Sequence, residues 1–354
     1  MSIFAFFLLC SFLGYCFLTE GFRQGVSELF RALIFVWLLN TFFLQIYQVP
    51  TGSMIPTILE GDVVVVSKLH YGPKTPQIPL HIPFTESTFL GKKSYSALIK
   101  LPIFRFWGIS DVKRGDIIVF NTPHEQDRPI GMRQLYTKRC IGLPGDRVAL
   151  RNGHYFINGI KEAHDEKRRL KFTIKASKAL PDLFLDDYIQ EHRLIGPNTY
   201  SGYGIRCKMK ELAQCAFITH IGYAPELTAT NEMAEVLVPY KGMKVTLNMA
   251  NCLSYQKTIA DHEGNREVCL KGGKLLINGV AQSHYTFKQD YYFASGDNRH
   301  NSYDSRAWGF VPKNHLVGKA LGILASGKNP KRHLMLNLLT FQVRSNRFFR
   351  RMAN

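Results

Sequence analysis

The sequence predicts a mainly β protein with two N-terminal transmembrane helices and an inserted accessory domain. Two stretches of 18 uncharged residues, Ser2 to Thr19 and Ala32 to Val49, predict the helices. Short β-branched runs such as Asp62 to Ser67 predict buried strands of an antiparallel, β-rich domain. A hairpin motif that occurs twice, 120 residues apart, predicts that a segment is inserted between the two copies.

The two apolar stretches determine the expected relation to a membrane. At 1.5 Å per residue each would span about 27 Å, the thickness of a bilayer core. The first has no Lys or Arg before it and no small-x-small site after it, so we expect a retained helix rather than a cleaved signal peptide. The second contains Asn40 and Gln45, which leaves a buried helix of a soluble protein as the alternative, but Trp37 and Tyr47 favour an interfacial end. Two Arg in the loop Glu20 to Arg31 favour a cytoplasmic loop, which would place everything after Val49 on the outer face of the membrane.

The repeated motif defines the expected domain boundaries. Val148 to Gly153 followed by Ile157 to Ile160 recurs as Val268 to Gly273 followed by Ile277 to Val280. Each copy contains two strands with Gly and Asn-Gly turns, which is typical of a β-hairpin, although chance similarity is the alternative. The expected parts are two membrane spans (1–48), a β-rich domain in two pieces (49–160 and 268–326), an accessory insertion (161–267) and a basic amphipathic tail (327–354).

The sequence leaves two interpretations open for each of two segments, residues 71–110 and the C-terminal tail. Tyr71 to Ser110 is rich in Pro, Phe, Ile and Leu without periodicity, and is either a membrane-hugging surface or a loop packed on the core. No acid follows Asp304, whereas ten Lys and Arg do. The apolar segment Leu334 to Met352 with its arginines is therefore either pressed on anionic lipid headgroups or a solvated tail.

Charge and cysteine usage restrict the partners. The net charge of +18 does not predict a nucleic-acid partner, because the basic residues are spread along the chain without aromatic-interleaved or helix-turn-helix motifs. Four of the seven cysteines would face an oxidising compartment, where one or two disulfides of undetermined pairing are possible: Cys207, Cys215, Cys252 and Cys269. No pair has zinc-ligand spacing, and we expect neither a metal nor an organic cofactor.

Ser53 is the candidate nucleophile. It lies in the turn Pro50 to Thr57, just after the second apolar stretch, where Gly and Pro can hold it rigidly in front of a substrate that leaves the membrane. A serine hydroxyl needs a base to remove its proton. None of the twelve histidines lies in a recognisable Ser-His-Asp pattern, so a different residue type is the better candidate for the base.

Lys138 is the candidate base. It lies within the apolar strand segment Leu135 to Leu143, where alternation places it with Tyr136 and Cys140 and turns Arg139 to the other face. Free lysine has a pKa of about 10.4 and is protonated at neutral pH. Burial lowers that pKa, and a shift of about 3 units corresponds to roughly 4 kcal/mol. A snorkelling strand lysine is the alternative.

A polar loop, Ser295 to Arg306, forms the third candidate segment. Such a loop can satisfy its own backbone through Asx turns and ion pairs, which is the structural interpretation for most of its residues. Ser302 is the exception, because its hydroxyl could orient a lysine amine.

Taken together, these segments resemble the bacterial type I signal peptidases, membrane-anchored Ser/Lys endopeptidases that remove signal peptides. The resemblance covers both apolar stretches and three blocks in the family's order: PTGSMIPT with GDVVVVSK, RGDIIVF with YTKRCIGLPGD, and GDNRHNSYDSRAWGFVP. It implies a β-rich catalytic core with an accessory domain at the insertion, which looks longer here than in many members.

The resemblance also implies catalytic roles. Ser53 would be the nucleophile and Lys138 the general base. The Ser53 backbone N–H and the Thr51 hydroxyl would form the oxyanion hole, with Thr where many relatives have Ser. Ser302 would hydrogen-bond the lysine amine.

Other matching residues would support the site. Asp304 and Arg306 resemble the family's structural ion pair, and Asp297 would support the same wall. His300 occupies a place where some relatives have Asp, and this difference puts no catalytic role in doubt.

The expected activity is cleavage of secreted preproteins after a small-x-small motif through an acyl-enzyme. The expected partners are preproteins and membrane lipid, while contact with the secretion machinery and the oligomeric state stay open. One rival is a Ser/Lys self-cleaving regulator, which the spans and the lack of a DNA-binding domain disfavour. The other is a catalytically idle membrane scaffold, which often loses the nucleophile or the base; this sequence keeps both.

Overall fold

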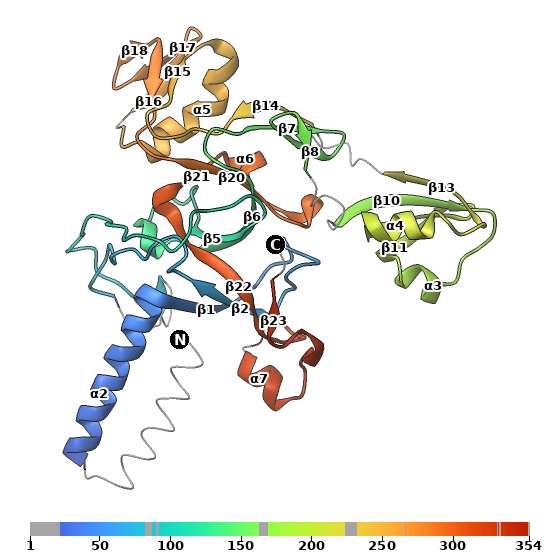
Figure 1. Ribbon diagram of the computed structural model, residues 1–354, viewed down its shortest axis with the longest axis horizontal. Helices are drawn as coiled ribbons and strands as arrows, with labels where there is room; N and C mark the ends of the chain where they lie inside the picture. The colour runs from blue at the N-terminus through green and yellow to red at the C-terminus, as the bar shows by residue number, and fades with distance from the viewer. Residues whose placement is uncertain are drawn as a thin grey trace. The chain divides into compact units, whose positions relative to one another are not determined.

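The chain forms two compact units, each built mainly from antiparallel strands (Figure 1). The computed structural model describes residues 22–81, 87–89, 92–162, 169–223, 232–265, 267–330, 332 and 334–352 of the 354-residue chain. The first unit covers Met1–Thr51, Leu59–Thr137 and Pro312–Asn354, and the second covers Gly52–Ile58 and Lys138–Val311. The predicted β-rich, antiparallel architecture is confirmed.

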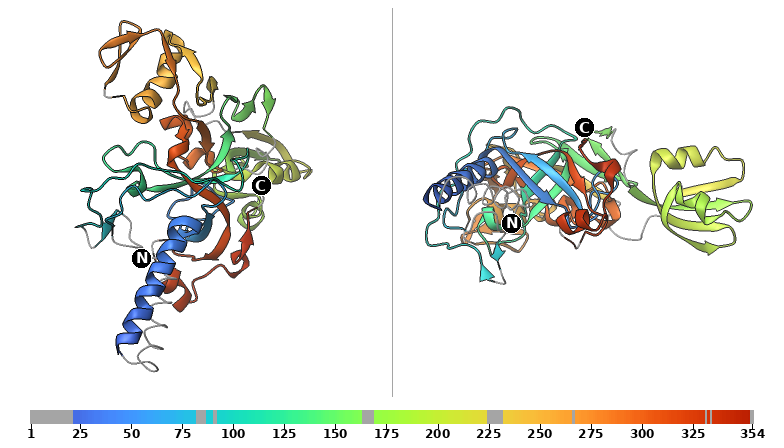
Figure 2. Two further views of the ribbon diagram at one scale, coloured as in Figure 1. Left: turned by 60° about the vertical axis from the view of Figure 1, so that its left-hand side comes forward. Right: turned by 90° about the horizontal axis from the view of Figure 1, so that it is seen from below.

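One helix at the start of the first unit is long and apolar enough to span a bilayer (Figure 2). It comprises α2 (Phe22–Leu38) and the π-helical turn η1 (Leu39–Phe43), and its apolar window is Val26–Phe43. The expected first span, residues 2–19, lies outside the described residues.

The second expected span is shifted relative to the prediction. Residues 32–49 do not form one helix, because Leu44–Gln48 is a strand, β1, that pairs with β2 (Asp62–Ser67). Conversely, the helix begins within the segment expected as the loop between the spans. All five residues of β1 pair with β2 in an unbroken antiparallel register, which gives this segment its extended conformation.

Four strands of the first unit lie in the order β1-β2-β22-β5, where β22 is Leu316–Ser326 and β5 is Ile117–Asn121. The valine run of β2 is buried almost throughout, as expected for a strand with neighbours on both edges and covered faces. Smaller elements of this unit are β3 (Thr88–Phe89), β4 (Lys92–Lys93), η2 (Ile130–Met132) and η5 (Lys313–His315).

The C-terminal segment is packed on the first unit rather than being a free tail. It contains α7 (Leu334–Leu339), η6 (Ser345–Arg347) and β23 (Arg350–Arg351), which pairs with β22. Arg347 forms a buried ion pair with Asp62 at 2.6 Å. This pair and the pairing of β23 with β22 hold the segment on the first unit, whereas Arg350 and Arg351 are exposed.

Both predicted hairpins form in the second unit, in the same register. The first consists of β7 (Arg147–Arg151), β8 (His154–Ile157) and β9 (Ile160–Lys161), and the second of β16 (Val268–Lys271), β17 (Lys274–Ile277) and β18 (Val280–Gln282). Asn158 and Asn278 take left-handed φ values of 52° and 51° in the equivalent turns. Each also accepts a backbone N–H hydrogen bond through its side-chain oxygen.

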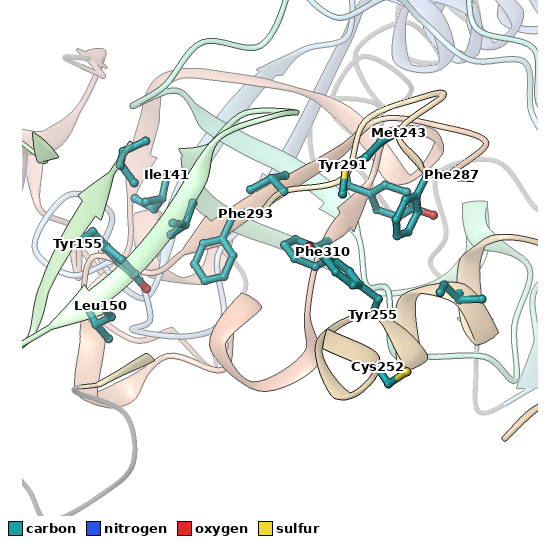
Figure 3. Packing of buried hydrophobic residues seen from close by; sticks show 14 of the residues in the cluster. Ile141, Leu150, Tyr155, Met243, Cys252, Tyr255, Phe287, Tyr291, Phe293 and Phe310 are labelled. Atoms are coloured by element: carbon teal, nitrogen blue, oxygen red, sulfur yellow. The ribbon is translucent and has the colours of Figure 1, made fainter. Parts of the chain in front are cut away.

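The two hairpins contribute to one hydrophobic core (Figure 3). Its central residues include Leu150 and Tyr155 from the first hairpin, Leu275 from the second, and Phe293. Four further elements complete this region: β14 (Met233–Leu237), which pairs with β7; β15 (Lys244–Thr246), which pairs with β19 (His284–Thr286); and α5 (Met249–His262), capped by Asn248.

Residues 169–223 form a separate sheet with its own core. Its strand order is β11-β12-β10-β13, with β10 at Arg169–Ala176, β11 at Ile189–Gly196, β12 at Thr199–Ile205 and β13 at Ile218–Tyr223. Helices α3 (Asp182–Asp186) and α4 (Arg206–Leu212) adjoin it, and Ile174, Leu185 and Leu212 are fully buried. The region 161–267, expected as one insertion, therefore contains two parts, because residues from 232 onward join the hairpin core instead.

Three of the four cysteines considered for disulfides are free thiols: Cys215, Cys252 and Cys269. The side chain of Cys207 lies outside the described part of the chain.

Candidate active site

Ser53 lies in a buried turn of the second unit that the polar loop after β20 (Tyr291–Ser295) holds in place. The backbone N–H of Asn298 donates to the Ser53 carbonyl, and its side-chain amide donates to the Gly52 carbonyl, both at 3.0 Å. Within the described residues, the Ser53 N–H has no hydrogen-bond acceptor. The turn therefore leaves that donor available to a ligand.

Lys138 contacts Ser53 directly. It lies on β6 (Leu135–Gly142), which pairs with β20, and its Nζ donates to Ser53 Oγ at 2.5 Å. Lys138 is only 4% exposed, and burial lowers its pKa from 10.5 to about 8. The negative charges of Asp304 and Asp297 oppose this shift, whereas the Arg306 charge adds to it. The lysine is thus poised to exchange a proton near neutral pH.

Arg139, the next residue on β6, has a different partner. Its Nε and Nη2 donate to the two carboxylate oxygens of Asp297 at 2.8 and 2.6 Å. Thr57 Oγ1, from the nucleophile turn, donates to the same carboxylate at 2.5 Å. Asp297 therefore joins the Lys138 strand to the Ser53 turn.

Asp304 is the centre of a second buried network. It accepts hydrogen bonds from Arg306 Nε at 2.8 Å, from the Gly296 N–H at 3.0 Å and from the Ser302 hydroxyl at 2.8 Å. Burial alone raises the pKa of this carboxyl, but the Arg306 charge and the hydrogen bonds outweigh it and hold the pKa below its usual value. Asp304 is also the N-cap of the short helix α6 (Ser305–Trp308), which precedes β21 (Val311–Pro312).

Gly296 brings the loop close to the nucleophile. A Cβ on this residue would lie 2.2 Å from Ser302 Oγ and 2.4 Å from the Ser53 carbonyl oxygen, so no larger residue fits. The Ser302 hydroxyl donates to Asp304, which leaves its oxygen able to accept. Its bond to the lysine amine stays a prediction.

Two further predicted residues lie at the edge of this arrangement. Thr51 is exposed, and its hydroxyl makes no hydrogen bond to the described residues, so its oxyanion role stays a prediction. His300 lies in the turn η4 (Arg299–Asn301), and its ring is 6.2 Å from that of Tyr203 on β12.

Known proteins are similar to this chain in sequence. A family model described as "Signal peptidase, peptidase S26" matches residues 23–196 and 237–325. The chain belongs to this signal peptidase family. Membership makes it a serine endopeptidase, and the match includes Ser53, Lys138 and the loop from Ser295 to Arg306.

Individual signal peptidases are similar over most of the chain. Signal peptidase I of Buchnera aphidicola subsp. Schizaphis graminum is 29% identical over 86% of this chain and 75% of the relative. Signal peptidase I of Aquifex aeolicus is 27% identical over 87% of this chain and 86% of the relative. The crystal structure of a signal peptidase I from Enterococcus faecalis covers 60% of this chain and 98% of that chain, at 18% identity and a TM-score of 0.25, too low to support an argument about the fold.

Sequence reasoning missed three residues of this site: Asn298, Arg139 and Thr57. A signal existed for Arg139, because a guanidinium in the middle of a buried strand requires a buried acidic partner. No comparable signal existed for Asn298 or Thr57, whose partners are set by the approach of distant segments.

Proposed function

We propose that this chain removes signal peptides from secreted preproteins with a Ser53/Lys138 dyad. The observation that carries the proposal is the 2.5 Å contact between Lys138 Nζ and Ser53 Oγ, made by a lysine whose pKa is lowered to about 8. A neutral amine at that distance can take the hydroxyl proton as the serine attacks. The relatives named above are signal peptidases, which supports the choice of substrate.

The reaction proceeds through an acyl-enzyme. Lys138 takes the proton of Ser53 as Oγ bonds to the scissile carbonyl carbon, which forms a tetrahedral oxyanion. The Ser53 N–H and the Thr51 hydroxyl stabilise this oxyanion, by about 3–4 kcal/mol per donor. When the C–N bond breaks, the Lys138 ammonium protonates the leaving amine of the mature chain. Lys138 then activates a water that hydrolyses the ester, which releases the signal peptide and restores Ser53.

The setting of this reaction is a membrane surface. The helix Val26–Phe43 anchors the chain, and the catalytic units lie on the outer face, where secreted preproteins emerge. Cleavage follows a small-x-small motif in the signal peptide. Arg23, just before this apolar window, supports the orientation, because positive residues that flank a span favour the cytoplasmic side.

The test is cleavage of a preprotein with an Ala-x-Ala site by the detergent-solubilised full chain. The wild type should release the mature chain, and Ser53→Ala should leave the precursor intact. Hydroxylamine trapping of the ester in the wild type distinguishes an acyl-enzyme from direct attack by water. An intact precursor with the wild type, or equal cleavage by Ser53→Ala, would refute the proposal.

The pH dependence gives an independent prediction. The folded-state pKa of Lys138 is about 8, so the base is mostly protonated and inactive below that pH and neutral above it. The kcat/KM value should rise with pH, with an apparent pKa of about 8. A profile that stays flat between pH 6 and 9, roughly the range over which this base changes charge, would contradict a lysine base.

A further inference from the structure

A pocket of the second unit lies between the nucleophile turn and the sheet of residues 169–223. Its volume is about 370 Å³, and we call it the sheet pocket. On one side it is lined by Ile55 and Pro56, which follow Ser53 by two and three residues. The polar side chains of the lining come from the sheet and from the region of α3 and α4, yellow-green in Figure 1: Asp186, Asp187, Tyr188, Tyr203 and Lys208. The reaction steps proposed above use none of these side chains.

The sheet pocket is within reach of a peptide that is held at Ser53. Consecutive Cα atoms are about 3.8 Å apart, so the Cα of Ile55 lies at most about 7.6 Å from that of Ser53. An extended substrate advances about 3.3 Å per residue. A side chain roughly two to five residues from the scissile bond can therefore enter the pocket.

The polar loop that holds the nucleophile turn also contacts the wall of the pocket. The ring of Tyr203, which lines the pocket, lies 6.2 Å from the ring of His300 in η4. Gly204 follows in the same wall, where a Cβ would lie 3.0 Å from the Tyr188 carbonyl oxygen, so the backbone is closely packed. The pocket is therefore built against the same loop that supports Ser53.

The charges of the lining favour a cationic ligand. The Asp187 carboxylate has no hydrogen-bond or ion-pair partner among the described residues, and Asp186 Oδ1 lies 3.4 Å from His192 Nδ1. Lys208, the cation of the described lining, donates to the Asp187 carbonyl at 2.5 Å, so its ammonium is held by the backbone. Two exposed carboxylates thus face one lysine that is already bonded, which leaves acceptors for a second cation.

The pocket suits the part of a preprotein that follows the scissile bond. The proposed cleavage motif has small side chains before that bond, and a small side chain would neither fill about 370 Å³ nor pair with a carboxylate. The apolar segment of a signal peptide would desolvate the carboxylates without pairing them, which costs free energy. The mature chain, which lies in water, can supply a charged side chain instead.

We propose that the sheet pocket binds a Lys or Arg side chain of the mature part of the preprotein, a few residues after the cleavage site. Asp186 and Asp187 then act as specificity-determining residues that the accessory sheet supplies. Lys171 Nζ already lies 5.9 Å from the centroid of the Tyr203 ring, so the carboxylates rather than this ring provide the recognition. The inference rests on the signal-peptide removal proposed above and assigns a role to residues 169–223.

The first test measures cleavage of a peptide panel by the detergent-solubilised full chain. Each peptide carries an Ala-x-Ala site and a single Lys or Glu placed roughly two to five residues after the cut. At the best position, we expect kcat/KM for the Lys peptide to exceed that for the Glu peptide about five- to tenfold, because exposed charge pairs are weak but of opposite sign in the two peptides. The ratio should shrink at high salt.

Three variants test whether the pocket causes this preference. Asp186→Asn with Asp187→Asn should cut the Lys and Glu peptides within about twofold of each other. Asp182→Asn is the matched control, because it removes an exposed carboxylate of α3 that does not line the pocket, and it should keep the preference. Asp187→Lys should reverse the preference, which a purely structural residue would not do. An unchanged ratio in the double variant, or an equal loss in the control, would overturn the proposal.

The second test reads binding without cleavage. The full chain with Ser53→Ala is titrated into fluorescein-labelled Lys and Glu peptides, and the anisotropy is followed. We expect the Lys peptide to bind about five- to tenfold more tightly, and this difference to disappear when the two Asn substitutions are added. Equal Kd values for the two peptides would overturn the proposal.

The remaining outcomes are distinguishable. If the wild type cuts no substrate, the proposed function fails, while the binding experiment still tests the sheet pocket. An equal loss of cleavage of both peptides in the double variant, with the ratio unchanged, would show a defect in folding or catalysis and would overturn the specificity role.

Discussion

Lys138 and Arg139 are neighbours on β6, equally buried, with opposite electrostatic surroundings. They are 4% and 6% exposed. Arg139 is matched by the Asp297 carboxylate, with two hydrogen bonds of 2.8 and 2.6 Å. Lys138 contacts a neutral hydroxyl at 2.5 Å, and burial lowers its pKa to about 8. The comparison teaches that two equally buried cations on one strand can differ in their partners: Arg139 has a carboxylate, whereas Lys138 contacts a hydroxyl and has a pKa lowered by burial.

Burial and the Arg306 charge explain how Lys138 keeps a lowered pKa although the acid Asp304 is near. Asp304 attracts the lysine proton, but Arg306 lies against the same carboxylate at 2.8 Å and repels it. The two opposing effects leave burial as the dominant influence on Lys138. The Arg306 charge therefore offsets part of the effect of Asp304 on Lys138.

The largest expected effect is the loss of peptidase activity when Lys138, but not its neighbour Arg139, is the candidate base that is removed. Lys138→Met keeps the length of the side chain but removes the base, and we expect kcat/KM for a preprotein to fall by at least about 10³-fold. Cleavage is measured at pH 8, near the pKa given above, with circular dichroism to check folding. Activity within about tenfold of the wild type would remove Lys138 from the mechanism.

Arg139→Met should mainly affect stability. It leaves the Asp297 carboxylate buried without its matching cation, and removal of one partner of a buried pair costs about 3–5 kcal/mol. Chemical unfolding of the solubilised full chain, followed by tryptophan fluorescence, measures the change. The double variant Arg139→Met with Asp297→Leu is the control, since loss of both charges should recover most of the stability. A double variant as unstable as the single one would contradict the ion-pair explanation.

Strand alternation explains why the two faces of β6 could be predicted from the sequence. The apolar segment around Lys138 indicated a strand, and a period of two separates adjacent side chains. The direction of the Lys138 pKa shift could also be predicted from the sequence, because burial in an apolar strand is enough to lower the pKa of a lysine. The equal register of the two hairpins could be predicted for the same local reason: Asn-Gly turns fix the pairing.

The partners of these cations could not be predicted from local pattern. Asp297 is 158 residues from Arg139, and nothing near either residue specifies the other. Asp62 and Arg347, 285 residues apart, are a second case. Residues 44–48 were misassigned to a membrane span because their composition is apolar enough for a helix, whereas pairing with the valine strand β2 determines their conformation.

A smaller expected effect is a gain in stability from Lys138→Met. The pKa of Lys138 is about 8 in the folded chain and about 10.5 when unfolded, so the folded state binds fewer protons between these values. The cost of the buried charge is complete below pH 8 and disappears as pH rises toward 10.5. At pH 7 the Met variant should be more stable by up to about 3 kcal/mol.

The same unfolding experiment, repeated at several pH values, checks this prediction. The stability of the wild type should rise relative to that of the variant between pH 8 and 10.5. A difference that is independent of pH would show that Lys138 titrates alike in both states. Arg139→Met is the matched comparison, since a guanidinium stays charged throughout this range.

The smallest expected effect concerns Thr57, which shares the Asp297 carboxylate with Arg139. Thr57→Val keeps the shape of the side chain and removes the hydroxyl that donates at 2.5 Å, which should cost about 1 kcal/mol of stability. In the Arg139→Met background the same change should cost more, because the carboxylate then depends more strongly on each remaining donor. A double-mutant cycle measures this coupling directly. Additive effects would mean that Thr57 and Arg139 stabilise the nucleophile turn independently, and Asp297 would no longer be the residue that joins Ser53 to the Lys138 strand.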